Sequence, residues 1–189
     1  MINTYNESDL HRTVKNLMAD NYNGKTEQKV GSYICDILCA DNTIIEIQTQ
    51  NLGNLTAKIL NLLQSHRVIL VHPLATQSYI EYYAQDTDGN IAAQPLSRRK
   101  SPKKKNIYHI FDELMGIYPA LLHEDFTLQI IEVVITKKRI RLEKAVQTPN
   151  KNRRFLRNWI SHDTSLDKIT ATHLFNTAEH YTDLLPISL

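Results

Sequence analysis

The sequence predicts an α/β protein in which a mixed central sheet is flanked by helices. Residues 29–39 and 43–49 are apolar runs rich in β-branched residues, and the Ala-Asp-Asn-Thr turn between them is typical of two paired strands. The run Arg67–His72 holds four branched apolar residues without alternation, which indicates a strand buried on both faces. Helical patterns lie before and between these strands, so both element types share one core.

Two amphipathic helices accompany these strands. The first is expected over Glu7–Asp20, where apolar residues recur at helical spacing and either Asn6 or Ser8 can cap the helix. Gly24 is suited to the position just after its end. The second helix is expected over Asn54–Ser65. The order up to Pro73 is therefore helix, strand, strand, helix, strand.

Beyond Pro73 the expected elements are less regular. They comprise a short strand or helix at Ser78–Gln85, a turn at Asp86–Asn90, an exposed mobile loop at Ser97–Asn106, a helix at Ile107–Gly116, a long strand or hairpin pair at Thr127–Arg141, and helices at Arg153–His162 and Thr170–Tyr181. We therefore expect a core at residues 1–95, a basic loop at 96–106 and a C-terminal unit at 107–189. The unit's element order suits a mainly helical extension of helix-turn-helix or winged type.

Composition excludes several classes of protein. The apolar content of 42% is near that of globular proteins and argues against global disorder. Only five glycines are present and no glycine-rich phosphate-binding motif occurs, which argues against nucleotide-driven motors and dinucleotide oxidoreductases. The two cysteines form no disulfide framework, and the polar N-terminus lacks a signal-peptide core. We expect a cytoplasmic protein that does not enter the membrane.

Two acidic side chains interrupt the expected hairpin. Asp36 lies in its first apolar run and Glu46 in its second, with Gln48 two positions further on. Side chains at i and i+2 share one face of a strand, so the hairpin brings two acids and an amide together. Charge inside an apolar strand is costly unless a cation or hydrogen bonds compensate it, which makes this trio the first candidate site.

On these residues the chain resembles the PD-(D/E)XK superfamily of restriction-endonuclease-like nucleases. That pattern has an Asp late in one strand and Glu-x-Lys on the neighbouring strand, followed by a helix and another strand. Here Asp36 is followed, after nine residues, by Glu46-Ile47-Gln48. The resemblance covers residues 1–75 and implies the restriction-endonuclease-like fold. It also implies an accessory acid on the first helix, for which Glu7 is the candidate.

The chain departs from this pattern at the lysine position, which is Gln48. Some lineages of the superfamily use Gln there, where it can orient a water molecule but carries no charge. Lys58, one turn into the following helix, can supply the positive charge instead and stabilise the charge that develops in the transition state.

The resemblance implies Mg²⁺, with Mn²⁺ as a substitute, held by Asp36, Glu46 and the backbone carbonyl of Ile47. Independently, hydrolysis of a phosphodiester needs a hard cation to polarise the phosphoryl oxygen and activate water, and Mg²⁺ prefers carboxylate oxygens. No histidine pair has metal-ligand spacing. We interpret His72 as a structural histidine, and His11 as a surface partner of Glu7 four residues earlier.

Basic residues gather in two regions although the net charge is only +2. They can contact phosphates, and those expected to hold nucleic acid are Arg98, Arg99, Lys100, Lys103, Lys104, Lys105, Arg153, Arg154 and Arg157. The sequence therefore predicts a Mg²⁺-dependent endonuclease acting on DNA. Its alternatives are a catalytically silent nucleic-acid-binding or assembly module of the same fold, and a structural interaction protein. Whether the chain forms a homodimer stays open.

Overall fold

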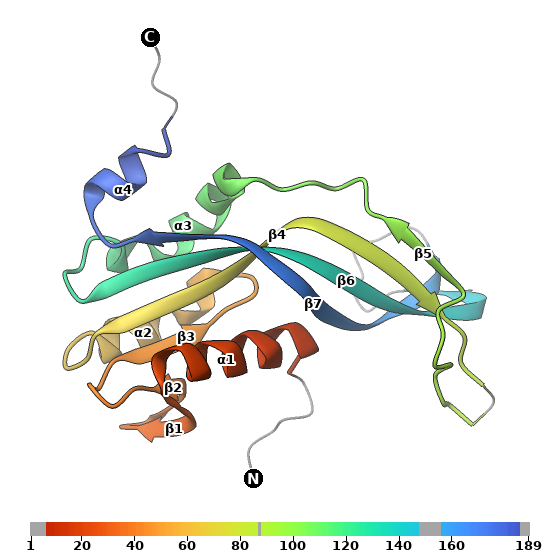
Figure 1. The fold of residues 1–189 in the computed structure, drawn as a ribbon, viewed down its shortest axis with the longest axis horizontal. Coiled ribbons are helices and arrows are strands. Elements are labelled where there is room, and N and C mark those ends of the chain that lie inside the picture. Colours follow the sequence, from red (N-terminus) through yellow and green to blue (C-terminus); the bar gives the residue numbers. More distant parts are fainter. Residues whose placement is uncertain (1–6, 87, 148–155, 186–189) are drawn as a thin grey trace.

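The computed structural model describes residues 7–86, 88–147 and 156–185, and within them a seven-stranded mixed sheet runs through the molecule (Figure 1). Its strands lie in the order β1-β2-β3-β4-β6-β7, with β5 beside the far part of β4. Their bounds are β1 Lys25–Val30, β2 Tyr33–Leu38, β3 Ile44–Ile47, β4 Val68–Tyr83, β5 Ser97–Lys100, β6 Phe126–Val146 and β7 Arg157–Phe175. The predicted α/β class with a mixed sheet flanked by helices is confirmed.

Helices, most of them short, precede, connect and follow these strands. Their bounds are α1 Asp9–Tyr22, η2 Leu52–Leu55, α2 Thr56–Leu62, η3 Ile107–Ile110, α3 Phe111–Ile117, η4 Tyr118–Ala120 and α4 Ala178–Thr182, where η marks a 3₁₀ helix. Ser8 caps α1, because its side chain accepts a hydrogen bond from the His11 amide. The left-handed residue that ends α1 is Asn23 rather than Gly24. None of the helices in the described residues is long and apolar enough to cross a membrane.

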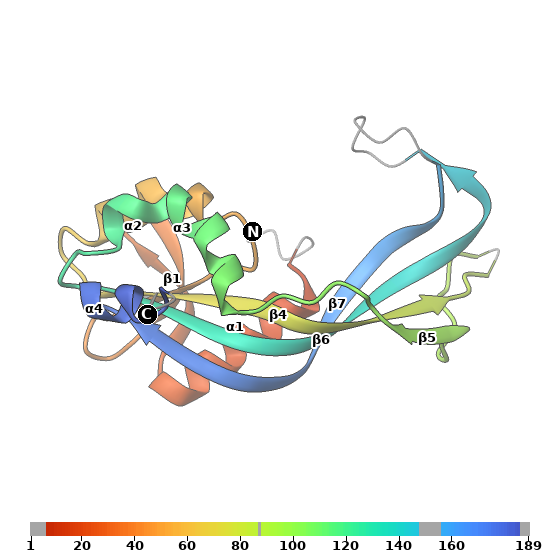
Figure 2. The same cartoon turned by 90° about the horizontal axis from the view of Figure 1, so that it is seen from above.

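The helices cover the sheet on both faces (Figure 2). On one face α1 packs Val14 and Met18 against Ile45 of β3 and Ile131 of β6. On the other face α2 and α3 contribute to a second apolar cluster around β4 and β6. The parallel strands β3, β4 and β6 are thus buried on both faces, as the unbroken apolar run after Arg67 predicted.

The first predicted strand is in fact two strands. Gly31 adopts a positive φ of 57° and allows a tight turn between β1 and β2, which then pair antiparallel. The expectation of extended backbone over most of residues 29–39 is therefore confirmed, but the expectation of one continuous strand is wrong. The core element order becomes α1-β1-β2-β3-α2-β4.

Part of the sheet extends beyond the helices as a long twisted projection (Figures 1 and 2). We call it the β-arm and define it as residues 77–83, 97–100, 135–146 and 157–166. In it β6 pairs in parallel with β4 and antiparallel with β7. Residues 97–100, expected within a mobile loop, form β5 and pair antiparallel with Tyr79–Tyr82. Their predicted exposure is confirmed.

The predicted helical C-terminal extension is wrong for most of its length. Residues 157–162 and 170–175 belong to β7, and only α4 lies within the helix expected at Thr170–Tyr181. Pairing with β6 over nearly all of β7 outweighs the local helical spacing. β4 precedes residues 96–106, whereas β6 and β7 follow them, and all three strands belong to one sheet. The described parts of the expected core and of the expected C-terminal unit therefore share this sheet.

Candidate functional site

Asp36 and Glu46 lie on adjacent strands, as expected. Ile37 pairs with Ile45 in the antiparallel register of β2 and β3, so the two acids occupy neighbouring cross-strand positions. The Asp36 carboxylate accepts a hydrogen bond of 2.8 Å from the Ile47 amide, which fixes its orientation. Glu46 is almost completely buried, with 2% of its surface exposed.

Lys58 reaches the same place from α2. Its Nζ lies 2.6 Å from Oε2 of Glu46 and donates a second hydrogen bond of 2.8 Å to the Ile34 carbonyl. Lys58 therefore lies beside the acids, because the helix that follows β3 places this half-buried side chain over Glu46.

Contacts with α3 hold the segment that carries Lys58. The Leu52 amide donates to the Glu113 carboxylate at 3.0 Å, and the Thr56 hydroxyl donates to the Gly116 carbonyl at 2.6 Å. Gly53 and Gly116 meet backbone to backbone, since a Cβ on Gly116 would lie 2.8 Å from Cα of Gly53. Only glycine permits this approach, which fixes the pose of α2 over the strands.

The electrostatics of Glu46 are unusual for a glutamate. Burial and the negative charge of Asp36 raise the pKa of Glu46 to about 7, although Lys58 opposes this shift. Oε2 is taken by Lys58, whereas Oε1 is buried and has no hydrogen-bond partner among the described residues. A buried oxygen without a partner is costly, so a bound cation or water at this atom would stabilise it.

His11 joins the acids from α1. Its Nδ1 contacts the Glu7 carboxylate, and its Nε2 donates to the Ile47 carbonyl at 2.9 Å and lies 3.6 Å from Oδ2 of Asp36. Burial alone would lower the pKa of His11, but Asp36 and Glu7 outweigh it and raise the pKa to about 9. In turn His11 and the Ile47 amide hold the pKa of Asp36 below its usual value despite burial.

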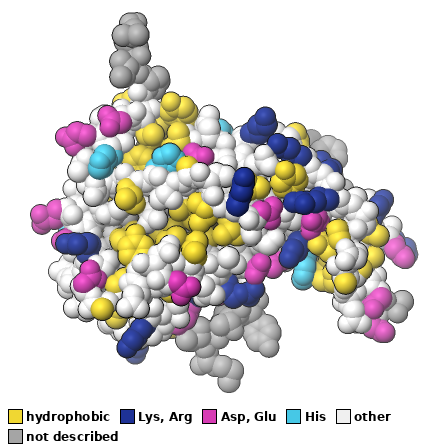
Figure 3. Space-filling model, viewed as in Figure 1, with side chains coloured by type: hydrophobic (Ala, Val, Ile, Leu, Met, Phe, Trp, Pro, Cys, Tyr) yellow, Lys and Arg dark blue, Asp and Glu magenta, His cyan; other side chains and the backbone are white. Residues whose placement is uncertain are grey.

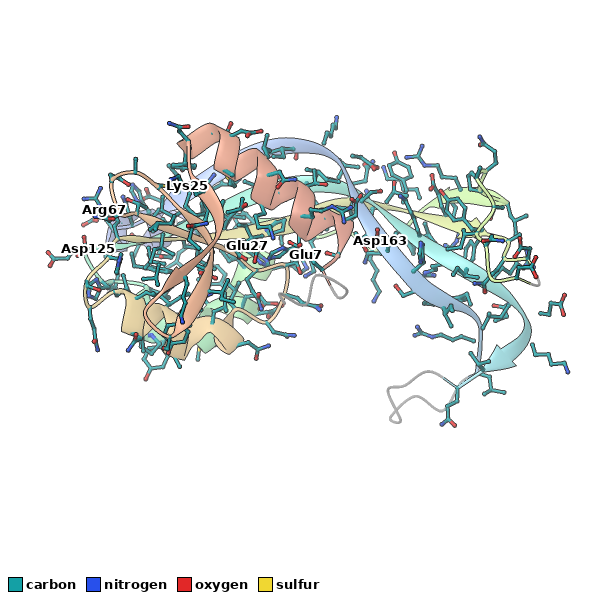
Figure 4. The ribbon with its side chains drawn as sticks, turned by 90° about the horizontal axis from the view of Figure 1, so that it is seen from below. Glu7, Lys25, Glu27, Arg67, Asp125 and Asp163 are labelled. Carbon is teal, nitrogen blue, oxygen red and sulfur yellow. The ribbon has the colours of Figure 1, made fainter. Side chains whose placement is uncertain are left out.

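Glu7 belongs to a second charged group beside α1. Lys15 is buried and pairs with Glu7 at 2.8 Å and also with Glu27 of β1. Figure 4 shows Glu7 and Glu27 on the same side of α1. Glu7 therefore acts on Asp36 through His11 rather than by direct contact. The sequence held a signal for this group, because residues 7, 11 and 15 repeat at i, i+4 spacing, but we interpreted His11 only as a surface partner of Glu7.

The side chains of Gln48 and His72 both contact backbone carbonyls. The Gln48 amide donates to the carbonyls of Gln50 at 2.7 Å and Asn51 at 3.3 Å, which leaves Oε1 to accept from a water molecule. His72 is buried on β4 and its Nδ1 contacts the Gln48 carbonyl at 2.7 Å. The interpretation of His72 as a hydrogen-bonded structural histidine is confirmed.

The oxygen donors at this site suit a hard cation. In the described part of the chain no group of three His, Cys, Asp or Glu side chains is arranged to hold a metal ion. Asp36, the Glu46 oxygen that has no partner in the described residues and the Ile47 carbonyl, which His11 contacts, are nevertheless oxygen donors of the kind that Mg²⁺ accepts. Mg²⁺ uses few protein ligands because it keeps several waters. The residues present therefore fit a magnesium ion.

The predicted nucleic-acid-binding residues lie away from the acids. Arg98, Arg99 and Lys100 are on β5, Lys103, Lys104 and Lys105 follow it, and Arg157 begins β7. Arg153 and Arg154 lie outside the described residues. Arg98 is paired with Glu81 at 3.4 Å and with Asp167 at 3.7 Å. Of the predicted residues that the structure describes, Arg98, Arg99, Lys100 and Arg157 therefore lie on the β-arm, and the three lysines lie in the segment after β5.

Comparisons with known proteins give a family but no activity. A family model described as "Domain of unknown function (DUF8091)" matches residues 8–176. An uncharacterized protein from Treponema pallidum (strain Nichols) is 33% identical over 132 residues, which cover 70% of this chain and 50% of that protein. The chain thus spans about half the length of this curated relative. No solved structure matches.

Proposed function

Because the chain belongs to the DUF8091 family, whose description names no activity, we propose its function from the site: a Mg²⁺-dependent nuclease that hydrolyses DNA phosphodiester bonds. The observation that carries this proposal is the buried carboxylate of Glu46. It lies beside Asp36, is paired with Lys58 through one oxygen and keeps the other oxygen without a partner in the described residues.

The arrangement of the core supports the resemblance to the PD-(D/E)XK nucleases. The element order is α1-β1-β2-β3-α2-β4, with Asp36 late in β2 and Glu46 in β3. Lys58 comes from the helix that follows β3 and reaches the Glu46 carboxylate. A cation thus stands beside the acids although the usual lysine position is Gln48.

The chain's own residues have distinct roles in this proposal. Asp36, Glu46 and the Ile47 carbonyl would hold Mg²⁺, or Mn²⁺ in its place. The bound ion would polarise a phosphoryl oxygen and lower the pKa of a water molecule. Lys58 is positioned to stabilise negative charge on the phosphoryl group, and Gln48 can orient a water through Oε1. Glu7 holds His11, which in turn orients Asp36.

A second candidate function is a catalytically silent nucleic-acid-binding module of the same fold. His11 favours this reading, because its Nε2 already contacts the Ile47 carbonyl and approaches Asp36, two of the proposed metal ligands. A charged imidazole at this place satisfies the same oxygens that a metal ion would use. Metal-dependent cleavage separates the two candidates.

The experiment is a cleavage assay on duplex, single-stranded and branched DNA with Mg²⁺, Mn²⁺ or EDTA. We expect cutting with either metal ion and none with EDTA. The matched control protein is Asp36→Asn, which keeps the shape of the side chain but weakens a proposed ligand. Salt-sensitive DNA binding without cutting on any substrate would favour the silent module instead.

A further inference from the structure

Arg139 occupies the centre of an aromatic cluster on the β-arm. Its guanidinium donates to the Tyr82 hydroxyl at 3.1 Å and lies 3.5 Å from the ring centroid of Trp159. Arg157 lies over the same ring at 4.5 Å. Tyr82, Arg139 and Trp159 come from β4, β6 and β7, so the cluster crosses three strands. Stacking on rings holds a planar guanidinium in a fixed orientation.

The charges of this cluster lack acidic partners in the described residues. In the described residues, no ion pair is formed by Arg99, Lys137, Arg139 or Arg157. By contrast, Arg98, which is on the same strand as Arg99, pairs with two carboxylates. Burial and the positive charges of Arg139, Lys103 and Lys105 lower the pKa of Lys137. Figure 3 shows basic side chains gathered over the β-arm, with acidic ones among them. Positive charge that stays uncompensated favours a polyanionic ligand.

The segment after β5 carries further positive charge in Lys103, Lys104 and Lys105. After β5 the chain returns along β4 to η3, next to α3 (Figure 1). Lys105 in this returning segment acts on Lys137 of the β-arm. Burial lowers the pKa of His72, and Lys105 lowers it in the same direction. The positive charge of the returning segment therefore adds to that of the β-arm.

We propose that this surface, formed by Tyr82, Arg99, Lys137, Arg139, Arg157 and Trp159 and named here the basic arm surface, binds the phosphate backbone of duplex DNA independently of its sequence. The choice of DNA rests on the proposed function. Two guanidiniums already lie over the Trp159 ring, where they compete with a base for stacking. Binders of single strands depend on free aromatic faces, and guanidinium groups suit phosphates instead.

The test compares Arg139→Gln/Arg157→Gln with Arg12→Gln/Arg67→Gln, a double variant outside the β-arm, as a matched control. Both control residues are exposed arginines whose charge is already paired, Arg12 with Asp9 and Arg67 with Asp125. Binding of a short mixed-sequence duplex is followed by fluorescence anisotropy in EDTA, so that no cleavage occurs. We expect Arg139→Gln/Arg157→Gln to bind the duplex at least about tenfold more weakly than wild type. The slope of log affinity against log salt concentration should fall in magnitude by about 2.

The control variant is expected to keep its affinity for the duplex within about twofold, since its charge is already paired. The single strand is expected to bind the unchanged protein more weakly than the duplex. An equal loss of duplex affinity in both variants would overturn the proposal. An unchanged duplex affinity in Arg139→Gln/Arg157→Gln, with its melting temperature also unchanged, would overturn it as well. Tighter binding of the single strand would overturn its duplex part. This binding measurement requires neither a metal ion nor cleavage. Its result is therefore independent of the outcome of the nuclease assay.

Discussion

Replacing Glu46 by Gln is expected to slow Mg²⁺-dependent DNA cleavage by at least about 10³-fold, which corresponds to about 4 kcal/mol of transition-state stabilisation. Gln has the shape of Glu but lacks the negative charge that would hold the metal ion. The chain should still fold, because Lys58 also donates to the Ile34 carbonyl and Gln offers an oxygen to it. Initial rates with Mg²⁺ and melting temperatures measure the two effects.

The matched control for this prediction is Asp41→Asn. Asp41 is an exposed carboxylate in the turn between β2 and β3, where it accepts a hydrogen bond from the Thr43 amide at 3.0 Å. It lies on the same hairpin as Glu46 but outside the proposed metal site, so its replacement should leave the cleavage rate nearly unchanged. Equal cleavage by wild type and Glu46→Gln would remove Glu46 from the mechanism.

The stability of the protein is expected to fall as pH rises through about 9, because His11 then loses its proton. The pKa of His11 is raised above its unfolded value of about 6.5, so its contribution is fully present below pH ~6.5 and is lost above the folded value. With 21% of its side chain exposed, His11 contributes at most about 3 kcal/mol to the free energy of unfolding.

Urea unfolding of wild type and His11→Gln at pH 6 and pH 10 measures this contribution. Gln can still donate one hydrogen bond toward the Ile47 carbonyl but carries no charge at either pH. Wild type should be the more stable protein at pH 6, and the difference should shrink at pH 10. A difference that stays constant between the two pH values would show that the charge of His11 does not stabilise the fold.

Local sequence predicted the acidic part of the site because its residues are close in the chain. Asp36 and Glu46 flank a short turn, so hairpin pairing alone places them side by side. Lys58 lies one short helix further on, and it meets Glu46 as the spacing implied. These contacts depend on strand register and helix length, which the pattern of apolar residues determines.

Other features depend on contacts that a single sequence does not reveal. The i, i+4 spacing of Glu7 and His11 predicted their contact, but the approach of His11 to the Ile47 carbonyl requires the packing of α1 over β3. Likewise, Gly31 splits an extended run only through a left-handed turn. In both cases the residues allow two structures, and only the folded geometry selects one of them. His11 could have been a surface residue, and residues 29–39 could have formed one strand.

The C-terminal region shows the limit of helical periodicity. Residues 157–162 and 170–175 have spacings compatible with an amphipathic helix, yet they pair with β6 over most of β7. The aromatic cluster of the β-arm also arises from this pairing, since Trp159 meets Arg139 only across the sheet. These two residues are about twenty positions apart in the sequence. Residues 148–155, which lie outside those described, are between them.

A calorimetric titration of wild type and Asp36→Asn with Mn²⁺ tests most directly whether the acids form a metal site. We expect saturable binding of Mn²⁺ to wild type and loss of this binding in the variant, with equal melting temperatures of the two metal-free proteins. Binding of equal strength in both proteins, or none in wild type, would contradict it, and the carboxylates would then be a structural ion-pair network around Lys58 and His11.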